Sequence, residues 1–509
     1  MNKKLNMKKY TFASILVALL LTSMPTTYAQ TNKKVLTLDD VIELARTQST
    51  NALIARNRFR ASYWQYRSYK ANYLPSLSFS GTVPSYSTEY QQVYNSQTGA
   101  FEYVSSNLLS MSGNLSLSQN IGLTGGSIAV RSGLAYSHNM GDNDIEQFIA
   151  QPIVSIQLTQ PILKYNSLKW EKKTQPLQYD IAKQTYLSNM EDVNATAVRY
   201  FFSLALAQIN VQIAETNYTN SDTLYRMSEG RYQLGTIAED ELLQMKLSWL
   251  NSETNLKQAQ MNLRDQENRL KTFLGFNDNV SIELEIPYEI PTLQIDEQEV
   301  LAMALENNPD VAQQELSILQ SQSSVAQARA NRGLSADLTA SYGLSGSSSS
   351  RNDPFGIRQV YEDPKNSRSV MIGVQIPILD WGRRKGQYEN AKSNLELVQA
   401  QAEQTLVQFE QDLLLNVEQF NLQYDQVMIA AQSDTVAQRM YEVSKARYVI
   451  GSSTVLELQN ADASKDSNRR AYIQAIQTYW NYFYQVRKLA LFDFINRKPL
   501  EVDYDSIVR

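Results

Sequence analysis

The stretch that decides the fold is residues 395–431, LELVQAQAEQTLVQFEQDLLLNVEQFNLQYDQVMIAA. Its apolar positions divide 36 residues into ten steps, a mean of 3.6, which predicts one nearly straight stripe along an α-helix. The stripe consists of Leu395, Val398, Ala402, Leu406, Phe409, Leu413, Val417, Phe420, Tyr424, Val427 and Ala431. The same mixture of residues extends from 382 to 450, and about 68 residues at ~1.5 Å each make a helix about 100 Å long. No compact domain of this size needs a helix of that length.

The chain contains this pattern twice. A second long helix is predicted at 166–233, RYQLG at 231–235 recurs as RYVIG at 447–451, and EL at 241–242 recurs at the same offset as EL at 457–458. Because internal repeats decide the domain organisation, we predict two structural repeats, 30–292 and 293–493, followed by a tail at 494–509. The long helices belong to helical hairpins at 166–274 and 382–493. Pro176 should kink or interrupt the first long helix near its start.

Each repeat also has a segment that alternates like a β-strand. We predict β-hairpins within 76–160 of the first repeat and at 335–377 of the second, each preceded by helices at about 38–73 and 298–332. In the first strand, Leu77, Phe79 and Val83 alternate with serine and threonine. One apolar face and one hydroxyl-rich face suit a wall between lipid and a water-filled lumen, and the strands alone suit a soluble sandwich equally well.

The first repeat carries an insertion that predicts an additional hairpin at 109–137. Its strands flank the turn sequence GLTGG at 122–126, which lacks the Gly-Lys-Ser/Thr ending of a phosphate-binding loop. The chain therefore has six candidate strands rather than four. The additional hairpin could widen a barrel or form a separate extension, and we favour an extension beyond a 12-stranded barrel.

The N-terminus has the organisation of a secretory signal peptide. Four lysines precede an apolar run from Phe12 to Leu21. The small residues Thr27 and Ala29 then come just before a cleavage site after Ala29. A run of about ten residues is too short to span a bilayer as a helix, which needs roughly 20. We therefore predict a signal peptide at 1–29. No later stretch reads as a membrane-spanning helix, so membrane insertion would require a β-barrel.

The composition argues against catalysis and against nucleic-acid binding. There is no cysteine, and His138 is the only histidine, which leaves little material for a zinc site, a thiolate nucleophile or histidine-dependent chemistry. The chain is mildly acidic, with a formal charge of −5 and no basic block. We expect no enzyme, no cofactor, no metal and no nucleic-acid partner. A hydrolase would have to rely on a carboxylate pair, and none stands out.

The order of these features resembles the TolC-like outer-membrane efflux protein family. The resemblance rests on the duplicated Arg-Tyr-x-x-Gly stretch, on Pro-Ile-Leu at 161–163 and 377–379, on Tyr-Leu-Pro at 73–75 and on Asn-Pro-Asp at 308–310, and it covers the mature chain. It implies a homotrimer, mainly α, in which a 12-stranded membrane β-barrel continues into a long periplasmic α-helical barrel. The trimer would sit in outer-membrane lipid and extend into the periplasm.

The function that this resemblance implies is passive export through a duct. In the family, the duct works in a tripartite system with a periplasmic adaptor (membrane fusion) protein and an inner-membrane transporter. The alternative from the residues alone is a structural periplasmic coiled-coil protein without a pore. That alternative accounts for the helices but leaves the serine-rich strands unexplained.

The resemblance places the adaptor-docking tips at the turns of the two helical hairpins. The residues concerned are Arg231, Tyr232 and Gly235 in the first tip and Arg447, Tyr448 and Gly451 in the second. Glycine at these places also fits a helix C-terminal cap, because it adopts a positive φ without steric cost. The cap alone would explain the glycines.

Glu241 and Glu457 are the candidates for a periplasmic gate. Three copies of each would put six carboxylates in a narrow opening, and such a ring favours cations. Each glutamate also stands in the first turn of a helix, where an acid interacts favourably with the dipole, and Thr454 with Glu457 forms a capping box. The sequence departs from the family at Ser453, where the family carries a gate arginine, so a tight latch is not expected there.

Overall fold

The computed structural model describes residues 32–140, 144–276, 280–349 and 356–509, and the predicted signal peptide lies outside them. The chain divides into two compact units. One comprises Met190–Gln294, Gln419–Gln485 and the described part of Met1–Ile54, and the other comprises Ala55–Asn189, Ile295–Glu418 and Val486–Arg509. The second unit contains the main sheet, and the first contains the turns of both long helical hairpins.

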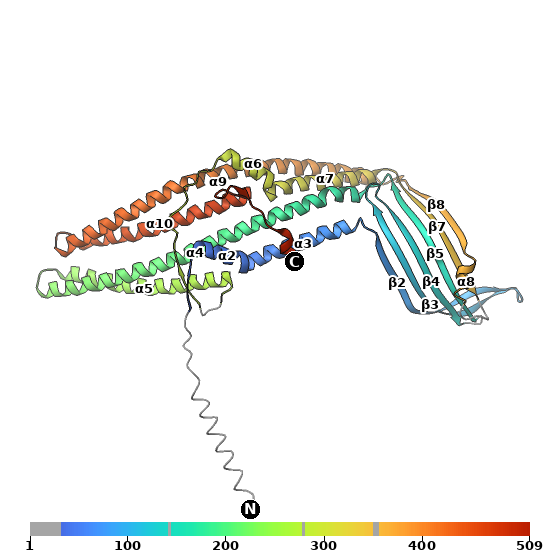
Figure 1. The fold of residues 1–509 in the computed structure, drawn as a ribbon, viewed down its shortest axis with the longest axis horizontal. Helices are drawn as coiled ribbons and strands as arrows, with labels where there is room; N and C mark the ends of the chain where they lie inside the picture. Colours follow the sequence, from blue (N-terminus) through green and yellow to red (C-terminus); the bar gives the residue numbers. More distant parts are fainter. Residues whose placement is uncertain (1–31, 141–143, 277–279, 350–355) are drawn as a thin grey trace, which may run out of the picture. The chain divides into compact units, whose positions relative to one another are not determined.

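Six antiparallel strands form the main sheet (Figure 1). They are β2 (Ser76–Asn95), β3 (Ala100–Ile121), β4 (Gly126–Met140), β5 (Asp144–Ile162), β7 (Ser335–Ser349) and β8 (Lys365–Gln375), paired in that order. Within the described residues, β2 and β8 are the two edges. The six strands predicted from the alternation are thereby confirmed.

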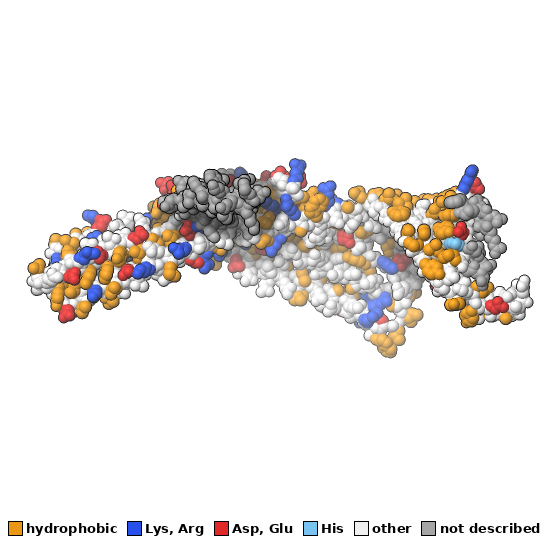
Figure 2. All heavy atoms as spheres, turned by 90° about the horizontal axis from the view of Figure 1, so that it is seen from below, with side chains coloured by type: hydrophobic (Ala, Val, Ile, Leu, Met, Phe, Trp, Pro, Cys, Tyr) orange, Lys and Arg blue, Asp and Glu red, His pale blue; other side chains and the backbone are white. Residues whose placement is uncertain are grey.

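The register gives the sheet one polar and one apolar face. Residues in register across all six strands make a polar row, which consists of Ser76, Ser118, Ala129, Gln157, Ser341 and Ser369. One position along, the row is apolar over five strands and consists of Leu77, Leu117, Val130, Ile156 and Tyr342. Leu77 is 66% exposed and Val370 on β8 is 76% exposed, so the apolar face is uncovered in the single chain. Hydrophobic side chains are visible over the sheet in the space-filling view (Figure 2).

The additional hairpin is not a separate extension, contrary to the reading that the sequence favoured. Its strands, β3 and β4, pair with β2 on one side and with β5 on the other, so the hairpin forms the middle of the wall. The cause is its alternation, which is in phase with that of its neighbours and completes both of their hydrogen-bonding edges.

Each copy of the repeat supplies a long helical hairpin. The first consists of α4 (Ser167–Gln233) and α5 (Glu239–Leu274), and the second of α9 (Arg383–Val449) and α10 (Val455–Ala490). Tyr225 stacks on Trp249 within the first hairpin, and Phe420 contacts Tyr479 within the second, with ring centroids 5.6 and 5.2 Å apart. Every residue of the predicted stripe on α9 is buried or half-buried. Pro176 lies inside α4, and the helix continues past it. The prediction that Pro176 could interrupt the helix was therefore wrong.

Short helices lead into the sheet in both repeats. These are α2 (Leu38–Gln48) and α3 (Thr50–Ala71) in the first copy, and α6 (Glu297–Asn307) and α7 (Pro309–Arg332) in the second. Thr37 and Asp40 close a capping box at the start of α2. Asn308 caps α7, whose first residue is Pro309, as the Asn-Pro-Asp motif predicted.

Several small elements were not predicted. A parallel pair joins β1 (Asn32–Leu36) to β6 (Val280–Leu284), and α8 (Gln359–Glu362) packs beside β7 with Val360 fully buried. The tail contains β9 (Phe492–Asp493), β10 (Lys498–Pro499) and α11 (Tyr504–Val508). These segments are too short to carry a periodic signal.

Candidate functional site

All eight of the site residues predicted from the sequence lie in the turns of the two helical hairpins or in the helical turns next to them. Both turns belong to the same compact unit. We call residues 231–238 the first tip and residues 447–454 the second tip. In the second, Val455, Leu458 and Ala461 of α10 pack into a buried cluster with Met245 of α5 and Tyr441 of α9, so the two hairpins share a small core.

The two tips have the same backbone. Gly235 has φ +72° and Gly451 has φ +78°. The amide of Gly235 donates to the carbonyl of Tyr232 at 2.9 Å, and that of Gly451 to the carbonyl of Tyr448 at 3.0 Å. The following amide in each tip donates to the carbonyl of the motif arginine at 2.9 Å. This is the Schellman cap that the glycines predicted, and it satisfies carbonyl groups that the helix leaves unpaired.

The motif tyrosines differ. Tyr232 is 42% exposed, whereas Tyr448 is only 2% exposed and belongs to the core cluster, against which Leu224, Tyr225 and Met227 of α4 pack. The hydroxyl of Tyr448 is buried without a hydrogen-bond partner. Tyr448 is therefore buried in this chain, where its side chain joins the two hairpins.

The motif arginines differ as well. Arg231 donates through Nη2 to the carbonyl of Val449 in the other hairpin at 3.2 Å. Arg447 donates through Nη2 to the carbonyl of Ser452 in its own turn, also at 3.2 Å. One arginine thus bridges the two tips, and the other braces its own turn.

The two candidate gate glutamates occupy equivalent first turns but have different surroundings. Glu241 is half-buried beside Glu239 and Asp240 in the first turn of α5. Glu457 is exposed, its amide is capped by the Thr454 hydroxyl at 3.2 Å, and its carboxylate accepts a hydrogen bond from Ser453. The Ser453 hydroxyl, the Thr454 backbone and the charge of Arg447 lower the pKa of Glu457, which favours its ionised form.

A set of polar contacts between the hairpins was not predicted. Asn217 of α4 donates to Asp466 of α10 at 2.6 Å, Asn220 of α4 donates to the Tyr441 hydroxyl at 3.1 Å, and Lys445 donates to Asn220 at 3.0 Å. Asparagines have no period that marks them as contacts, so only the spacing of Asn217 and Asn220 on one helix face was available as a signal.

Lys465 is the charged centre of this contact set. Its ammonium lies 2.7 Å from Asp462, 3.2 Å from Asp466 and 4.1 Å from the centroid of the Tyr441 ring. Burial alone would lower the pKa of Lys465, but the hydrogen bond and charges of the two aspartates outweigh it and raise the pKa. Lys465 therefore stays protonated at neutral pH.

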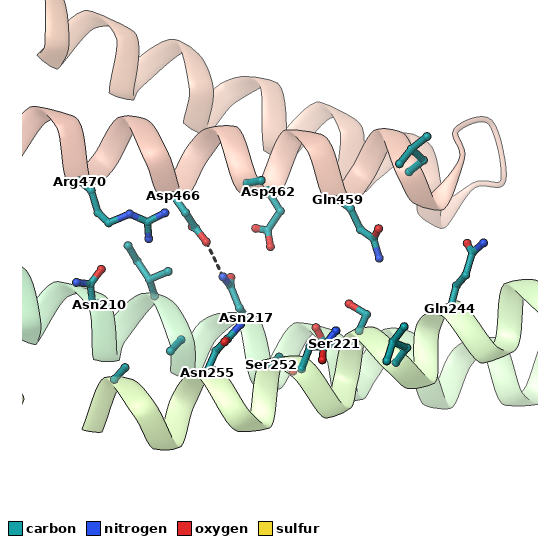
Figure 3. Close-up of a pocket in the computed structure, with 18 residues that line it drawn as sticks. Asn210, Asn217, Ser221, Gln244, Ser252, Asn255, Gln459, Asp462, Asp466 and Arg470 are labelled. Carbon is teal, nitrogen blue, oxygen red and sulfur yellow. Dashed lines mark hydrogen bonds between the residues drawn. The ribbon is translucent and has the colours of Figure 1, made fainter. Parts of the chain in front are cut away.

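A polar cavity of about 830 Å³ lies between α4 and α5 on one side and α10 on the other (Figure 3). Asn217, Ser221 and Asn255 point toward it from the first hairpin, and Asp462 and Asp466 from the second. Amides, hydroxyls and carboxylates predominate, so the hairpins face each other here across a polar gap rather than an apolar seam. A polar contact of this kind, which water can enter, separates more easily than packed apolar side chains.

Neither a metal site nor a membrane-spanning helix is found in the part of the chain that the structure describes. No three histidine or acidic side chains there gather as metal ligands. Among the described helices, none combines the length and the apolar composition that crossing a bilayer requires.

A two-faced sheet joined to two helical hairpins, each with one helix of 67 residues, is the architecture of a channel protein of the cell envelope. The comparisons agree. The model of the outer membrane efflux protein family matches residues 41–276 and 300–490. The chain belongs to the outer membrane efflux protein family. It is an efflux duct of the outer membrane that extends into the periplasm.

Solved structures with the same fold are outer-membrane proteins, several of them channels. The CmeC outer membrane channel of Campylobacter jejuni is 18% identical with a TM-score of 0.63, over 92% of this chain and 88% of that one. VceC of Vibrio cholerae is 16% identical with a TM-score of 0.61, over 89% and 95%. The open-state MtrE channel of Neisseria gonorrhoeae is 15% identical with a TM-score of 0.57, over 89% and 88%. No curated protein matches the sequence.

Proposed function

We propose that three copies of this chain form a passive duct, which an inner-membrane transporter feeds through a periplasmic adaptor. The observation that carries the proposal is the sheet with two free edges. An exposed apolar face and unpaired strand edges are unstable in an isolated chain, and closing the sheet with further copies in lipid removes both. Cyclic symmetry closes the helices into a tunnel at the same time.

We assign the adaptor-docking surface to the exposed residues of the tips. Tyr232, Arg231, Arg447 and the two turn glycines are accessible or half-accessible, whereas Tyr448 supports the surface from below. An aromatic ring and two guanidinium groups are residue types enriched at protein interfaces. That the partner is a periplasmic adaptor is inferred from the family resemblance.

The docking assignment is tested by a photo-crosslinking residue placed at Tyr232 in cells. The expected product is a covalent adduct with a periplasmic protein that has an α-helical hairpin, identified by mass spectrometry. The same residue at Met261, which is 67% exposed on α5 away from the turn, should give none. Equal trapping at both positions, or trapping only of proteins without such a hairpin, would argue against the docking surface.

We assign the gate to Glu241 and Glu457, and its opening to separation of the hairpins. Six carboxylates in a trimer would attract cations and repel anions in a narrow entrance. The polar contacts from Arg231, Asn217 and Asn220 to the second hairpin would have to break as the hairpins part. Each such hydrogen bond contributes only about 0.5–1.5 kcal/mol, so the closed arrangement can be reversed.

The duct and gate are tested by single-channel current in a planar bilayer. We expect trimers from the outer-membrane fraction to conduct ions, with a cation preference that weakens in Glu241→Gln/Glu457→Gln. The matched control is Glu315→Gln/Glu403→Gln, which removes the same number of exposed carboxylates from α7 and α9 away from the tips. Unchanged selectivity in the first variant would remove the gate and leave the duct. A water-soluble protein without current would refute the duct and support the coiled-coil alternative.

A further inference from the structure

The additional hairpin is hydrogen-bonded along both flanks. β2 and β3 pair from Ser76 with Ser118 to Asn95 with Ala100, with one register shift between Thr82 and Ser85. On the other flank, β4 and β5 pair from Ser127 with Thr159 to Met140 with Asp144, with one register shift between Arg131 and Ala135. In this sheet the hairpin supplies the backbone partners of both β2 and β5, which buried or lipid-facing strands require.

The two faces of the sheet pass through the hairpin without a break. Ser118 and Ala129 continue the polar row, and Leu117 and Val130 continue the apolar row. A hairpin outside a membrane wall would have no reason to carry a lipid-compatible face in phase with its neighbours, because a shift by one residue would exchange the faces.

The turn of the hairpin is fixed to the base of the sheet. Asn120 donates to the carbonyl of Asn72 at 3.1 Å, and Gln160 donates to that of Thr124 at 3.0 Å. The Asn166 amide donates to the carbonyls of Gly122 and Leu123 at 3.4 and 3.3 Å. A Cβ atom on Gly122 would lie 2.8 Å from Cε1 of Tyr73, so this turn fits closely against the segment that enters β2.

The free edges are compatible with closure. Because every pairing in the sheet is antiparallel, β8 runs opposite to β2, and β8 of one copy can pair antiparallel with β2 of the next. We infer that three copies close an 18-stranded barrel in which the additional hairpin is part of the membrane wall. This inference rests on the proposed trimeric duct. Barrels of 16–18 strands leave an open aqueous channel, so the barrel itself does not restrict the cargo.

Disulfide trapping in the purified trimer tests the wall, since the chain has no cysteine of its own. The Oγ atoms of Ser76 and Ser118 are 2.9 Å apart, so Ser76→Cys/Ser118→Cys should form a disulfide between β2 and β3. The matched control is Ser341→Cys/Ser369→Cys across β7 and β8, with Oγ atoms 2.8 Å apart, which a barrel of either size brings together.

A third variant tests for the alternative, a 12-stranded barrel in which β2 pairs directly with β5. Ser76→Cys/Gln157→Cys places cysteines three strand spacings apart in this sheet, roughly 14 Å, beyond disulfide reach. The pair would meet only if β2 paired directly with β5. We expect near-complete cross-linking in the first two variants and none in the third, with 18 strands in cross-section by electron cryomicroscopy. A trimer that conducts, cross-links through the third variant and shows 12 strands would overturn the inference and leave the duct intact. Failure to form any conducting trimer would instead refute the proposed function.

Discussion

The two tips share a backbone and a motif but differ in what their side chains do. In the first tip Tyr232 is exposed and Arg231 reaches across to Val449, whereas in the second Tyr448 is buried and Arg447 bonds within its own turn. The difference shows that duplication preserves the turn, which glycine and helix capping dictate locally. The role of each side chain is set by the neighbouring hairpin, and only one copy can occupy the space between them.

The largest expected difference between the two tips comes from removing the ring of each motif tyrosine. We expect Tyr448→Ala to cost about 3–5 kcal/mol in the opening of the tip, because it empties a fully buried site. Tyr232→Ala should change the same free energy by less than about 0.5 kcal/mol. Amide hydrogen exchange measures both, over 441–461 for Tyr448→Ala and over 225–245 for Tyr232→Ala.

Tyr448→Phe separates packing from hydrogen bonding at this position. The buried hydroxyl has no partner, so its removal should leave exchange unchanged or slower. Equal losses for the two alanine variants would abolish the distinction between the tips.

Substitution of the two turn glycines should have equal effects, because the tips share a backbone even though their side chains differ. Gly235→Ala and Gly451→Ala each place a Cβ in the left-handed region, at a cost of about 1–2 kcal/mol. Limited proteolysis at the turns, followed by mass spectrometry, measures the local opening. Gly386→Ala is the control: Gly386 lies in the first turn of α9 with open space around it, so alanine there should be neutral or stabilising. Sensitivity at one tip alone would mean that the backbones are not equivalent.

The arginines should have unequal effects on the gate. Arg231→Met removes one of the bonds that join the hairpins and should raise the open probability of the channel by about fivefold, corresponding to a hydrogen bond of about 1 kcal/mol. Arg447→Met, which affects only its own turn, should leave gating near that of the wild type. Single-channel recording compares the two. A larger effect of Arg447→Met would mean that Arg447, rather than Arg231, makes the contact between the hairpins that controls opening.

The smallest expected effect concerns pH. Because the pKa of Glu457 is lowered from 4.5, its favourable interactions are fully present above that value and are lost as pH falls through the lower folded-state pKa. In a Glu241→Gln background, cation preference should therefore persist just below pH 4.5 and disappear at lower pH. Ser453→Ala removes the main cause of the shift and should move the loss to higher pH. A titration that is identical with and without the serine would contradict this account.

The sequence predicted the long helices almost to the residue. The stripe on α9 has a clear period, and Gly235 and Gly451 mark the ends of helices that were expected at 233 and 450. The six strands were also readable from their period of two, but their bounds were less accurate: the additional hairpin was predicted to begin at 109, and β3 begins at Ala100. The capping geometry of the site followed from the same local rules.

The side-chain roles at the site could not be predicted. Tyr232 and Tyr448 occupy the same place in one motif, and their exposure depends on α4 residues that no local pattern connects to the second tip. The bond between Asn217 and Asp466 joins residues 249 positions apart. The placement of the additional hairpin depended on pairing with both neighbours at once. The roles of the glutamates and of the docking residues remain predictions.

The β2–β3 ladder has more paired residues than the other ladders of the main sheet. β8 has 11 residues, enough to cross an outer membrane at a tilt, whereas β2 has 20 and continues to Asn95. Beyond Ser85 this ribbon exposes Tyr86, Tyr90 and Tyr94. In a duct that opens to the outside of the cell, such a ribbon stands above the surface. Its turn near Gly99 is the place where an epitope tag would disturb the wall least.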